Sequence, residues 1–265
     1  LYTDEEWDKI EKIVRHERDD LLSYAATEQF RGKYLVQDRT TGTYYETPQM
    51  TYILIAAILF SNYPKETRLQ YVKDYYDAIS KGAKSTITLP TPIIAGVRTP
   101  MRQYSSCVLI ETGDSLDSIN ESASAIVDYA SRRAGIGLNA GRIRAVGSSV
   151  KKGAVYHTGN IPFYKYFQSA LKSCSQGAIR GASATTYYPL WHLEFESLVV
   201  LKNNKGVDEN RVRHMDYGVQ LNGYLYGRLL KNENITLFSP HDVPDLYEAF
   251  FADQKLFGEL YEKYE

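Results

Sequence analysis

The sequence predicts an α/β protein that begins with a helical region, and three observations support this fold class. Up to about Ser80, apolar residues recur at helical spacing. From Ser85 onward, short β-branched runs alternate with longer helical segments. Glycine, proline and serine separate those runs. We therefore expect a helical domain with a small hairpin over 1–84 and an α/β domain over 85–265.

The helical region contains recognisable start signals. Thr3 and Glu6 have the spacing of a capping box ahead of an apolar helical face. A hairpin is expected where 33–37 and 43–46 flank Thr41 and Gly42. Pro48 suits the first position of an apolar helix that runs to about Phe60. The next helix is striped by Leu69, Val72, Tyr76 and Ile79.

The α/β region is expected to alternate strands with amphipathic helices. Strands are predicted over 85–89 and 106–111, and the clearest helix over 114–133, with Asp114 as its cap. A second helix begins near Asn160. Later helices are expected over 192–201, 216–230 and 243–264, with a strand over 235–238.

Composition excludes several classes of protein. The chain has 31 Lys and Arg against 32 Asp and Glu, so no basic field predicts a nucleic-acid partner. The longest apolar run, 52–60, is far shorter than the roughly 20 residues that cross a bilayer. Two cysteines are too few for a secreted disulfide framework. We expect a cytoplasmic protein without a membrane segment.

The segment 135–144 could bind phosphate, because its glycines permit close backbone approach and Arg142 and Arg144 supply guanidinium groups. Its glycine spacing departs from the dinucleotide-binding fingerprint, and the Lys-Ser/Thr pair of a P-loop is absent from it. The competing interpretation is a tight connection with solvated arginines.

The segment 173–183 is polar and glycine-rich, which suits either a ligand-binding loop or an exposed turn. Cys107 falls in an apolar run, so its residue type and position predict a small core residue on a buried strand. His192, Glu194 and Glu196 do not share a helix face, and His157 gives no local signal. No metal site or hydrolytic triad is predicted.

Several uncommon strings then occur in one order along the chain. They are LPTP at 89–92, SSCVLI at 105–110, GDSLDSI at 113–119, RAGIG at 133–137, NAGRIR at 139–144, CSQG at 174–177, RG at 180–181, KNN at 202–204 and RVRHMDY at 211–217. Together they resemble the large, catalytic subunit of class I (aerobic) ribonucleotide reductases. The resemblance covers essentially the whole chain and is strongest from residue 85.

This resemblance implies a helical region leading into the first half of a ten-stranded α/β barrel. It also assigns roles. Cys107 matches the barrel cysteine that is oxidised as the substrate loses its 2′-hydroxyl, against the prediction from its residue type. The positions that hold the nucleoside diphosphate are matched by Thr91, Ser106, Cys107, Ala134 and Gly135.

The same resemblance places an allosteric site and a loop. The specificity-effector site is matched by Asp114, Ser115, Leu116, Arg144 and Lys151. The loop that carries effector identity to the substrate is matched by 174–183, with Cys174, Gln176, Gly177 and Arg180. In this family the helices equivalent to 114–133 and about 160–172 pack against a two-fold mate, which implies a homodimer.

The implied activity is reduction of ribonucleoside diphosphates to 2′-deoxyribonucleoside diphosphates for DNA synthesis. The resemblance implies deoxynucleotide and ATP effectors with Mg²⁺, a metal-containing small subunit that supplies a radical, and thioredoxin or glutaredoxin as reductant. No covalently bound cofactor is expected in this chain.

The thiyl-radical cysteine, its glutamate neighbour, the second redox cysteine and the relay tyrosines of the family are expected beyond Glu265. An ATP-cone is not expected within the chain. We therefore expect 1–265 to be inactive in isolation. The alternative function is a nucleotide-binding and dimerisation module without catalysis.

Overall fold

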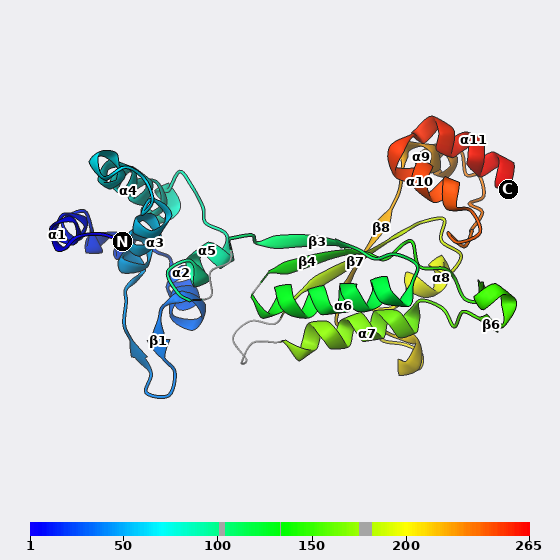
Figure 1. Cartoon of the computed structure of the whole chain (residues 1–265), viewed down its shortest axis with the longest axis horizontal. Coiled ribbons are helices and arrows are strands. Elements are labelled where there is room, and N and C mark those ends of the chain that lie inside the picture. The colour runs from blue at the N-terminus through cyan, green and yellow to red at the C-terminus, as the bar shows by residue number, and fades with distance from the viewer. Residues whose placement is uncertain (101–103, 133, 175–181) are drawn as a thin grey trace. The chain divides into compact units, whose positions relative to one another are not determined.

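The computed structural model describes residues 1–100, 104–132, 134–174 and 182–265. Within these residues the chain forms two compact units, the first within Leu1–Ser106 and the second from Cys107 onward. The first unit is helical and the second contains a parallel sheet covered by helices, as Figure 1 shows. The predicted fold class, a helical region followed by an α/β region, is confirmed.

The first unit consists of helices joined by short turns and one small hairpin. Its helices are α1 (Asp4–Glu11), α2 (Tyr24–Gln29), α3 (Pro48–Leu59), α4 (Lys65–Ile79) and α5 (Thr91–Gly96). The hairpin pairs β1 (Gln37–Asp38) with β2 (Thr43–Tyr44), and shorter helical turns span His16–Leu21, Phe30–Tyr34 and Gly82–Lys84. The hairpin strands are shorter than predicted.

The predicted start signals of the first unit are confirmed. Thr3 and Glu6 make both hydrogen bonds of a capping box at the start of α1. Thr47 caps α3, in which Pro48 is the first residue. The stripe on α4 packs Val72, Tyr76 and Ile79 against α3, which buries the core of this unit.

Residues 85–100 and 104–106 belong to the first unit, although the sequence predicts a domain boundary at 84/85. The strand predicted over 85–89 does not form there. Instead Thr86 and Ile87 both donate their backbone N–H to the Ala78 carbonyl at the end of α4. Next, α5 buries Ile93 and the following Val97 against Ile55 of α3. Apolar burial on α3 thus holds this segment in the helical unit.

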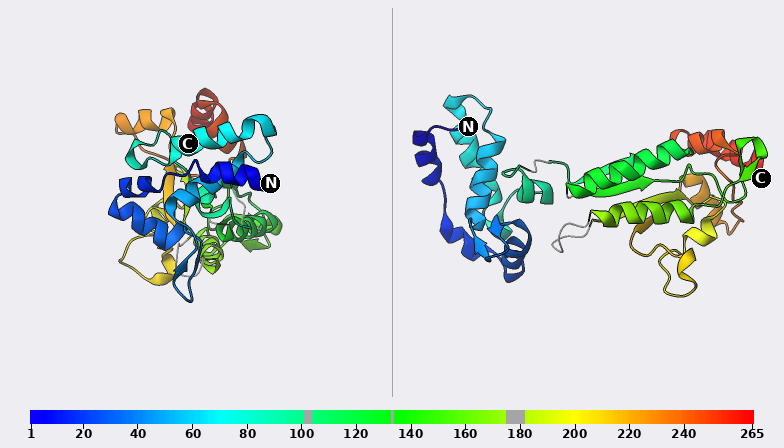
Figure 2. Two further views of the ribbon diagram at one scale, coloured as in Figure 1. Left: turned by 90° about the vertical axis from the view of Figure 1, so that its left-hand side faces the viewer. Right: turned by 60° about the horizontal axis from the view of Figure 1, so that its bottom comes forward.

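The second unit is built on a four-stranded parallel sheet. Its strands are β3 (Cys107–Glu111), β4 (Gly135–Asn139), β7 (Ala184–Pro189) and β8 (Asp216–Gln220), adjacent in that order. The register pairs Cys107 with Gly135 and Gly137 with Thr185. Helices α6 (Leu116–Ser131) and α7 (Ile161–Ser173) pack side by side on one face (Figures 1 and 2).

The remaining elements of the second unit follow the carboxyl ends of the strands. A hairpin joins β5 (Ser149–Val150) to β6 (Val155–Tyr156), and short helical turns span Lys151–Gly153 and Asp208–Asn210. The short helix α8 (Phe195–Leu198) follows β7. Three further helices, α9 (Gly223–Leu230), α10 (Pro244–Ala252) and α11 (Gln254–Tyr264), bury Trp191 in a separate aromatic core.

Several predicted elements of the second unit are wrong in type or extent. Asp216–Gln220 is strand β8 rather than the start of a helix, because it completes the sheet beside β7. Residues 135–139 form strand β4 rather than a loop, since alternate side chains enter the core. Only 195–198 of the helix expected over 192–201 forms. The strand at 235–238 is reduced to a bridge between Phe238 and His192.

Two helix boundaries also differ from the prediction. The cap of α6 is Ser115, whose hydroxyl accepts the Ser118 N–H, so Asp114 does not cap it. The helix expected over 243–264 is divided at Asp253, an extended residue whose side chain caps α11. In both cases one polar side chain satisfies the amides of the first turn.

The sheet face opposite α6 and α7 is sparsely covered among the described residues. Leu109 of β3 is 88 % exposed there. Its side chain lies against Gly137, and Tyr187 lies against Gly218, where a Cβ would clash with the ring. The glycines therefore let side chains from neighbouring strands lie flat across this face.

Candidate functional site

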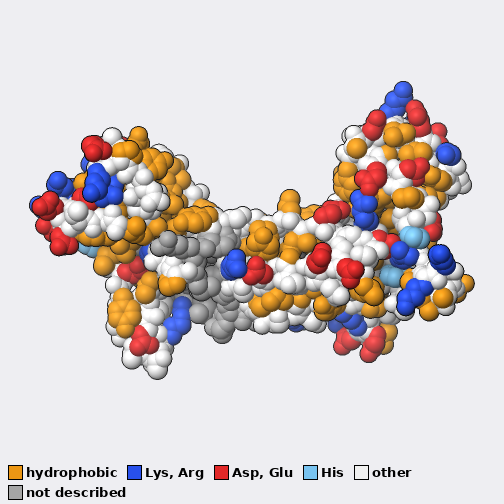
Figure 3. Space-filling model, viewed as in Figure 1, with side chains coloured by type: hydrophobic (Ala, Val, Ile, Leu, Met, Phe, Trp, Pro, Cys, Tyr) orange, Lys and Arg blue, Asp and Glu red, His pale blue; other side chains and the backbone are white. Residues whose placement is uncertain are grey.

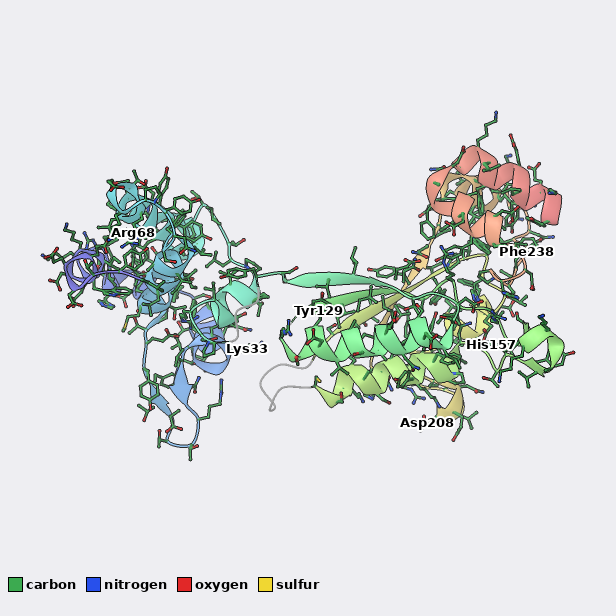
Figure 4. All side chains as sticks on the ribbon, in the orientation of Figure 1. Lys33, Arg68, Tyr129, His157, Asp208 and Phe238 are labelled. Atoms are coloured by element: carbon green, nitrogen blue, oxygen red, sulfur yellow. The ribbon has the colours of Figure 1, made fainter. Side chains whose placement is uncertain are left out.

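A small pocket opens where β3 ends and α6 begins, at the carboxyl ends of the parallel strands. Its volume is about 180 Å³. The lining residues come from the turn between β3 and α6, from α6 and α7, and from the segment between β4 and α7. They are Asp114, Ser115, Leu116, Ile119, Arg144, Val150, His157 and Phe163. Figure 4 labels His157 on the segment that leads into α7. The crevice beyond strand carboxyl ends is where open parallel sheets bind ligands.

The polar wall of the pocket is an ion pair between Asp114 and Arg144. The Asp114 carboxylate accepts the backbone N–H of Arg144 at 2.9 Å and its guanidinium Nε–H at 2.9 Å. A second guanidinium nitrogen approaches the same carboxylate at 2.8 Å. Both side chains remain about one-fifth exposed, 19 % for Asp114 and 18 % for Arg144. The pair is therefore ordered but within reach of a ligand.

Other groups complete the electrostatics of this wall. Arg144 also donates to the Ser149 carbonyl at 2.6 Å, and His241 Nδ1 lies 3.4 Å from the Asp114 carboxylate. Burial lowers the pKa of His157, with neighbouring Asp114 opposing that shift. The His157 ring stacks on Phe163 at 5.5 Å between centroids. A neutral imidazole beside a phenyl ring gives the pocket an aromatic side.

Four of the five predicted effector residues line this pocket: Asp114, Ser115, Leu116 and Arg144. The fifth, Lys151, is exposed in the turn directly after Val150 and does not line it. Lys151 and Lys152 have positive φ angles of 49° and 56°. Figure 3 shows cationic and histidine side chains gathered at this end of the second unit.

Arg142, the other guanidinium proposed for phosphate, has a different role. It pairs with Glu248 at 2.7 Å and lies over the Tyr247 ring at 4.7 Å. These contacts join the segment after β4 to α10. Arg144 lines the pocket, whereas Arg142 does not.

Sequence reasoning did not find Ile119, Val150, His157 and Phe163. These residues are dispersed over the chain and become neighbours when α6 and α7 pack together. The apolar face of α6 gave a signal for Ile119, but as a core residue. Nothing in the sequence around His157 distinguishes it from an ordinary surface histidine.

The predicted substrate-binding residues are divided between the units. Cys107, Ala134 and Gly135 belong to the second unit, where Cys107 is the register partner of Gly135 and Ala134 is buried. Thr91 and Ser106 belong to the first unit. Cys107 begins strand β3 but is exposed, so the expectation of a buried position is wrong. Val108 faces the core, so the Cys107 side chain lies on the opposite, sparsely covered face of the sheet.

Cys174 follows the last residue of α7 and packs partly against the main core of the second unit. The other predicted loop residues, Gln176, Gly177 and Arg180, lie outside the described residues.

In the described part of the chain, no group of three or more His, Cys, Asp or Glu side chains is placed to hold a metal ion. The helices described there are all too short or too polar to span a membrane.

Comparisons with known proteins place both regions of the chain in one family. Residues 105–265 match the model of the ribonucleotide reductase barrel domain, and residues 20–102 match that of the ribonucleotide reductase all-alpha domain. These two matches meet near the division between the structural units.

Curated relatives agree with these matches. The chain is 66 % identical over 264 residues to ribonucleoside-diphosphate reductase 1 subunit alpha of Escherichia coli (strain K12). It is equally similar, 66 % over 264 residues, to subunit alpha of Haemophilus influenzae. Identity to subunit alpha of Enterobacteria phage T4 is 56 % over 262 residues. The matches cover 98–100 % of this chain but 34 % of each relative, so the chain spans about a third of their length.

Proposed function

Since this chain belongs to the ribonucleotide reductase large-subunit family, we propose that it supplies the effector-reading part of an enzyme that reduces ribonucleoside diphosphates. The products are 2′-deoxyribonucleoside diphosphates, the precursors for DNA synthesis. One observation carries the proposal: the pocket at the strand ends brings together Asp114, Ser115, Leu116 and Arg144.

The pocket chemistry suits a deoxynucleoside triphosphate with its Mg²⁺. A carboxylate such as Asp114 accepts hydrogen bonds from a deoxyribose hydroxyl. The planar guanidinium of Arg144 matches phosphate oxygens, and Lys151 on the adjacent turn adds a mobile positive charge. Leu116 and Phe163 give the site an apolar wall. ATP would bind through the same triphosphate contacts.

Nucleotide binding at this site has to alter the Asp114–Arg144 pair. In the structure Arg144 gives both Nε and Nη to Asp114 and Ser149. A triphosphate would take over some of these donors, and the ribose hydroxyl would satisfy the carboxylate. The exchange is feasible because both side chains are partly exposed and a charge-assisted bond replaces one of similar kind.

We assign substrate reduction to the sparsely covered face of the sheet, where Cys107 begins β3. Reduction replaces the 2′-hydroxyl with hydrogen and releases water, and two thiols supply the two electrons as they form a disulfide. Cys107 would be one of these thiols. Thioredoxin or glutaredoxin would then reduce the disulfide by thiol exchange, and a metal-containing small subunit would supply the radical.

The outer surfaces of α6 and α7 support a homodimer. Leu116, Val127 and Tyr129 on α6 and Tyr166 on α7 are exposed apolar or aromatic residues. The pocket residue Phe163 lies near the start of α7 and Cys174 follows its end. A helix of that length spans about 20 Å. A two-fold mate with antiparallel helices would bring one chain's pocket toward the end of the other chain's α7.

Two measurements on the complete large subunit test this function. Cys107→Ser should abolish multiple turnover of CDP in the presence of the small subunit and a dithiol, whereas Cys174→Ser should retain most of it. In sedimentation, dTTP should strengthen self-association, since a ligand that prefers the dimer shifts the equilibrium toward it. Equal loss in both cysteine variants with intact folding would refute the assigned roles. A dimerisation equilibrium that does not change on addition of dTTP would indicate that the dimer surface is elsewhere.

A further inference from the structure

The backbone that carries Arg144 is held from beneath by buried side chains. Ile143 accepts a hydrogen bond from His192 Nε2 at 3.0 Å, and Arg144 accepts one from the Asn160 side chain at 3.2 Å. Ala145 donates to Ser239 Oγ at 3.2 Å. The following residue, Val146, donates to Glu194 at 3.1 Å. Every residue from 143 to 146 is therefore anchored through a backbone group.

The anchoring side chains are among the most buried polar groups of the second unit. His192 and Asn160 are 0 % exposed, Ser239 is 3 % and Glu194 is 8 % exposed. Polar groups at such depth are retained where their hydrogen bonds are satisfied. Each of the four side chains makes one hydrogen bond to the segment that carries Arg144.

Glu194 is the central member of this set. Its carboxylate accepts the N–H of Val146 and both the N–H and the side-chain amide of Asn160, the last at 2.6 Å. Val146 and Asn160 are the two ends of the segment 146–160, which contains hairpin β5–β6. One carboxylate thus holds the two ends of this segment together.

Two neighbours pack closely around Glu194. Gly159 has φ +99°, and a Cβ there would lie 2.7 Å from a Glu194 oxygen. His192 accepts the Glu194 N–H through Nδ1 at 3.1 Å, so its Nε2 carries the proton donated to Ile143. The imidazole is thereby fixed as one neutral tautomer.

We propose that Glu194 is a positioning residue for nucleotide binding, which sets the direction of the Arg144 guanidinium without touching the ligand. This inference rests on the proposed function of the pocket. Its basis is geometric. The residues that donate to the Glu194 carboxylate, Val146 and Asn160, are the two ends of the segment 146–160, and Arg144 lies two residues before that segment begins. A carboxylate only accepts hydrogen bonds, which suits a site that offers N–H donors alone.

The test is nucleotide affinity in the complete subunit, with dTTP as the probe. Glu194→Gln keeps the size of the side chain but turns an NH₂ donor toward the Asn160 and Val146 donors. We expect dTTP affinity to fall about tenfold, as for loss of a charge-assisted contact. The matched control is Glu196→Gln in α8, the helix that directly follows Glu194, because the Glu196 side chain is exposed. It should leave the affinity within about twofold of the wild type.

A double-mutant cycle separates positioning from general destabilisation. If Glu194 acts through Arg144, Glu194→Gln should weaken dTTP binding little further in an Arg144→Ala background. Equal losses in both backgrounds would overturn the proposal. So would wild-type affinity in Glu194→Gln when Arg144→Ala binds weakly. Unchanged affinity in Arg144→Ala would instead refute the function proposed for the pocket.

Should Glu194→Gln fail to fold, Asn160→Ala offers a milder perturbation. It removes the amide that donates to both Glu194 and the Arg144 carbonyl. We expect dTTP affinity to fall about threefold, roughly the contribution of one neutral hydrogen bond, and again no further loss in the Arg144→Ala background. Full affinity in Asn160→Ala would contradict the proposal.

Discussion

Arginine–carboxylate pairs occur in both units, but in different surroundings. In the first unit, Arg98 pairs with Glu46, and both side chains are 4 % exposed. Arg68 pairs with Glu6 at 2.5 Å under similar cover. In the second unit, Asp114 and Arg144 form a pair at 2.8 Å that borders a cavity. Pairing alone therefore does not identify a ligand site; a pair serves binding when a ligand can reach it and substitute for one partner.

The largest expected effect concerns Arg98 in the first unit. Arg98→Ala leaves Glu46 buried without its cation and removes donors to the Tyr34 and Ile94 carbonyls. The free energy of unfolding should fall by about 3–5 kcal/mol, the usual cost of breaking a buried pair. Urea denaturation measures this loss. Arg31→Ala, which breaks the exposed pair with Glu28, is the control and should cost less than about 1 kcal/mol. Similar losses in both variants would show that buried and exposed pairs do not differ in their contribution to stability.

The matching substitution in the second unit should act on binding. Arg144→Ala should weaken dTTP binding by about 1.5–3 kcal/mol, because a charge-assisted contact to phosphate is lost. Its effect on unfolding should be smaller than that of Arg98→Ala, since Asp114 remains hydrated. Equilibrium dialysis with labelled dTTP gives the affinity. If Arg98→Ala weakened dTTP binding as much while folded, the comparison would fail.

A smaller effect is expected in the turn between β5 and β6. Lys152 has φ 56°, a left-handed conformation that costs a side chain about 1 kcal/mol. The residue is exposed, so Lys152→Gly should stabilise the protein by up to about 1 kcal/mol without loss of packing. Thermal unfolding checks this gain. Destabilisation would show that Lys152 makes a contact that outweighs its strain.

The units should also respond differently to acid. The Arg68 guanidinium and the Thr3 amide lower the pKa of Glu6 to about 2. The stabilisation from Glu6 is therefore complete above its ordinary pKa of 4.5 and is lost as the pH falls toward 2. Burial lowers the pKa of His192, so its neutral form favours folding above about 6.5, and this contribution declines below that pH.

Residue-resolved NMR titration measures this difference. The second unit should lose stability first, as the pH falls below about 6.5, and the environment of Glu6 should change only at lower pH. A Glu6 titration near 4.5 would mean that its pair with Arg68 is weak in solution.

Local signals predicted the parts of the fold that depend on local contacts. Thr3 with Glu6, and Thr47 with Pro48, begin helices because their own side chains satisfy the first turn. Strand β8 was missed because its apolar alternation consists of Tyr217 and Val219 alone and runs directly into the helical residues from Gly223; its pairing with β7 makes it a strand. Gly218 is needed there by the Tyr187 ring on the neighbouring strand, which the sequence does not reveal.

Some residues of the candidate site were likewise predicted from the sequence, and others come together only through tertiary packing. Family resemblance placed Asp114 and Arg144, and the structure brings them together with Ser115 and Leu116. The opposing wall, with His157 and Phe163, arises from the packing of α6 against α7. The anchor Glu194 looked like an ordinary acidic residue of a helix, because its partners at 146 and 160 are distant in sequence.

Hydrogen exchange with and without dTTP tests most directly whether the pocket of the second unit binds the effector. In the complete subunit, dTTP should slow amide exchange in peptides spanning 113–119 and 144–160. Peptides from 1–80, which include the buried pair of Arg68 with Glu6, should exchange at the same rate with and without nucleotide. Protection confined to the first unit, or unchanged exchange over 144–160 at saturating dTTP, would contradict this placement of the effector site.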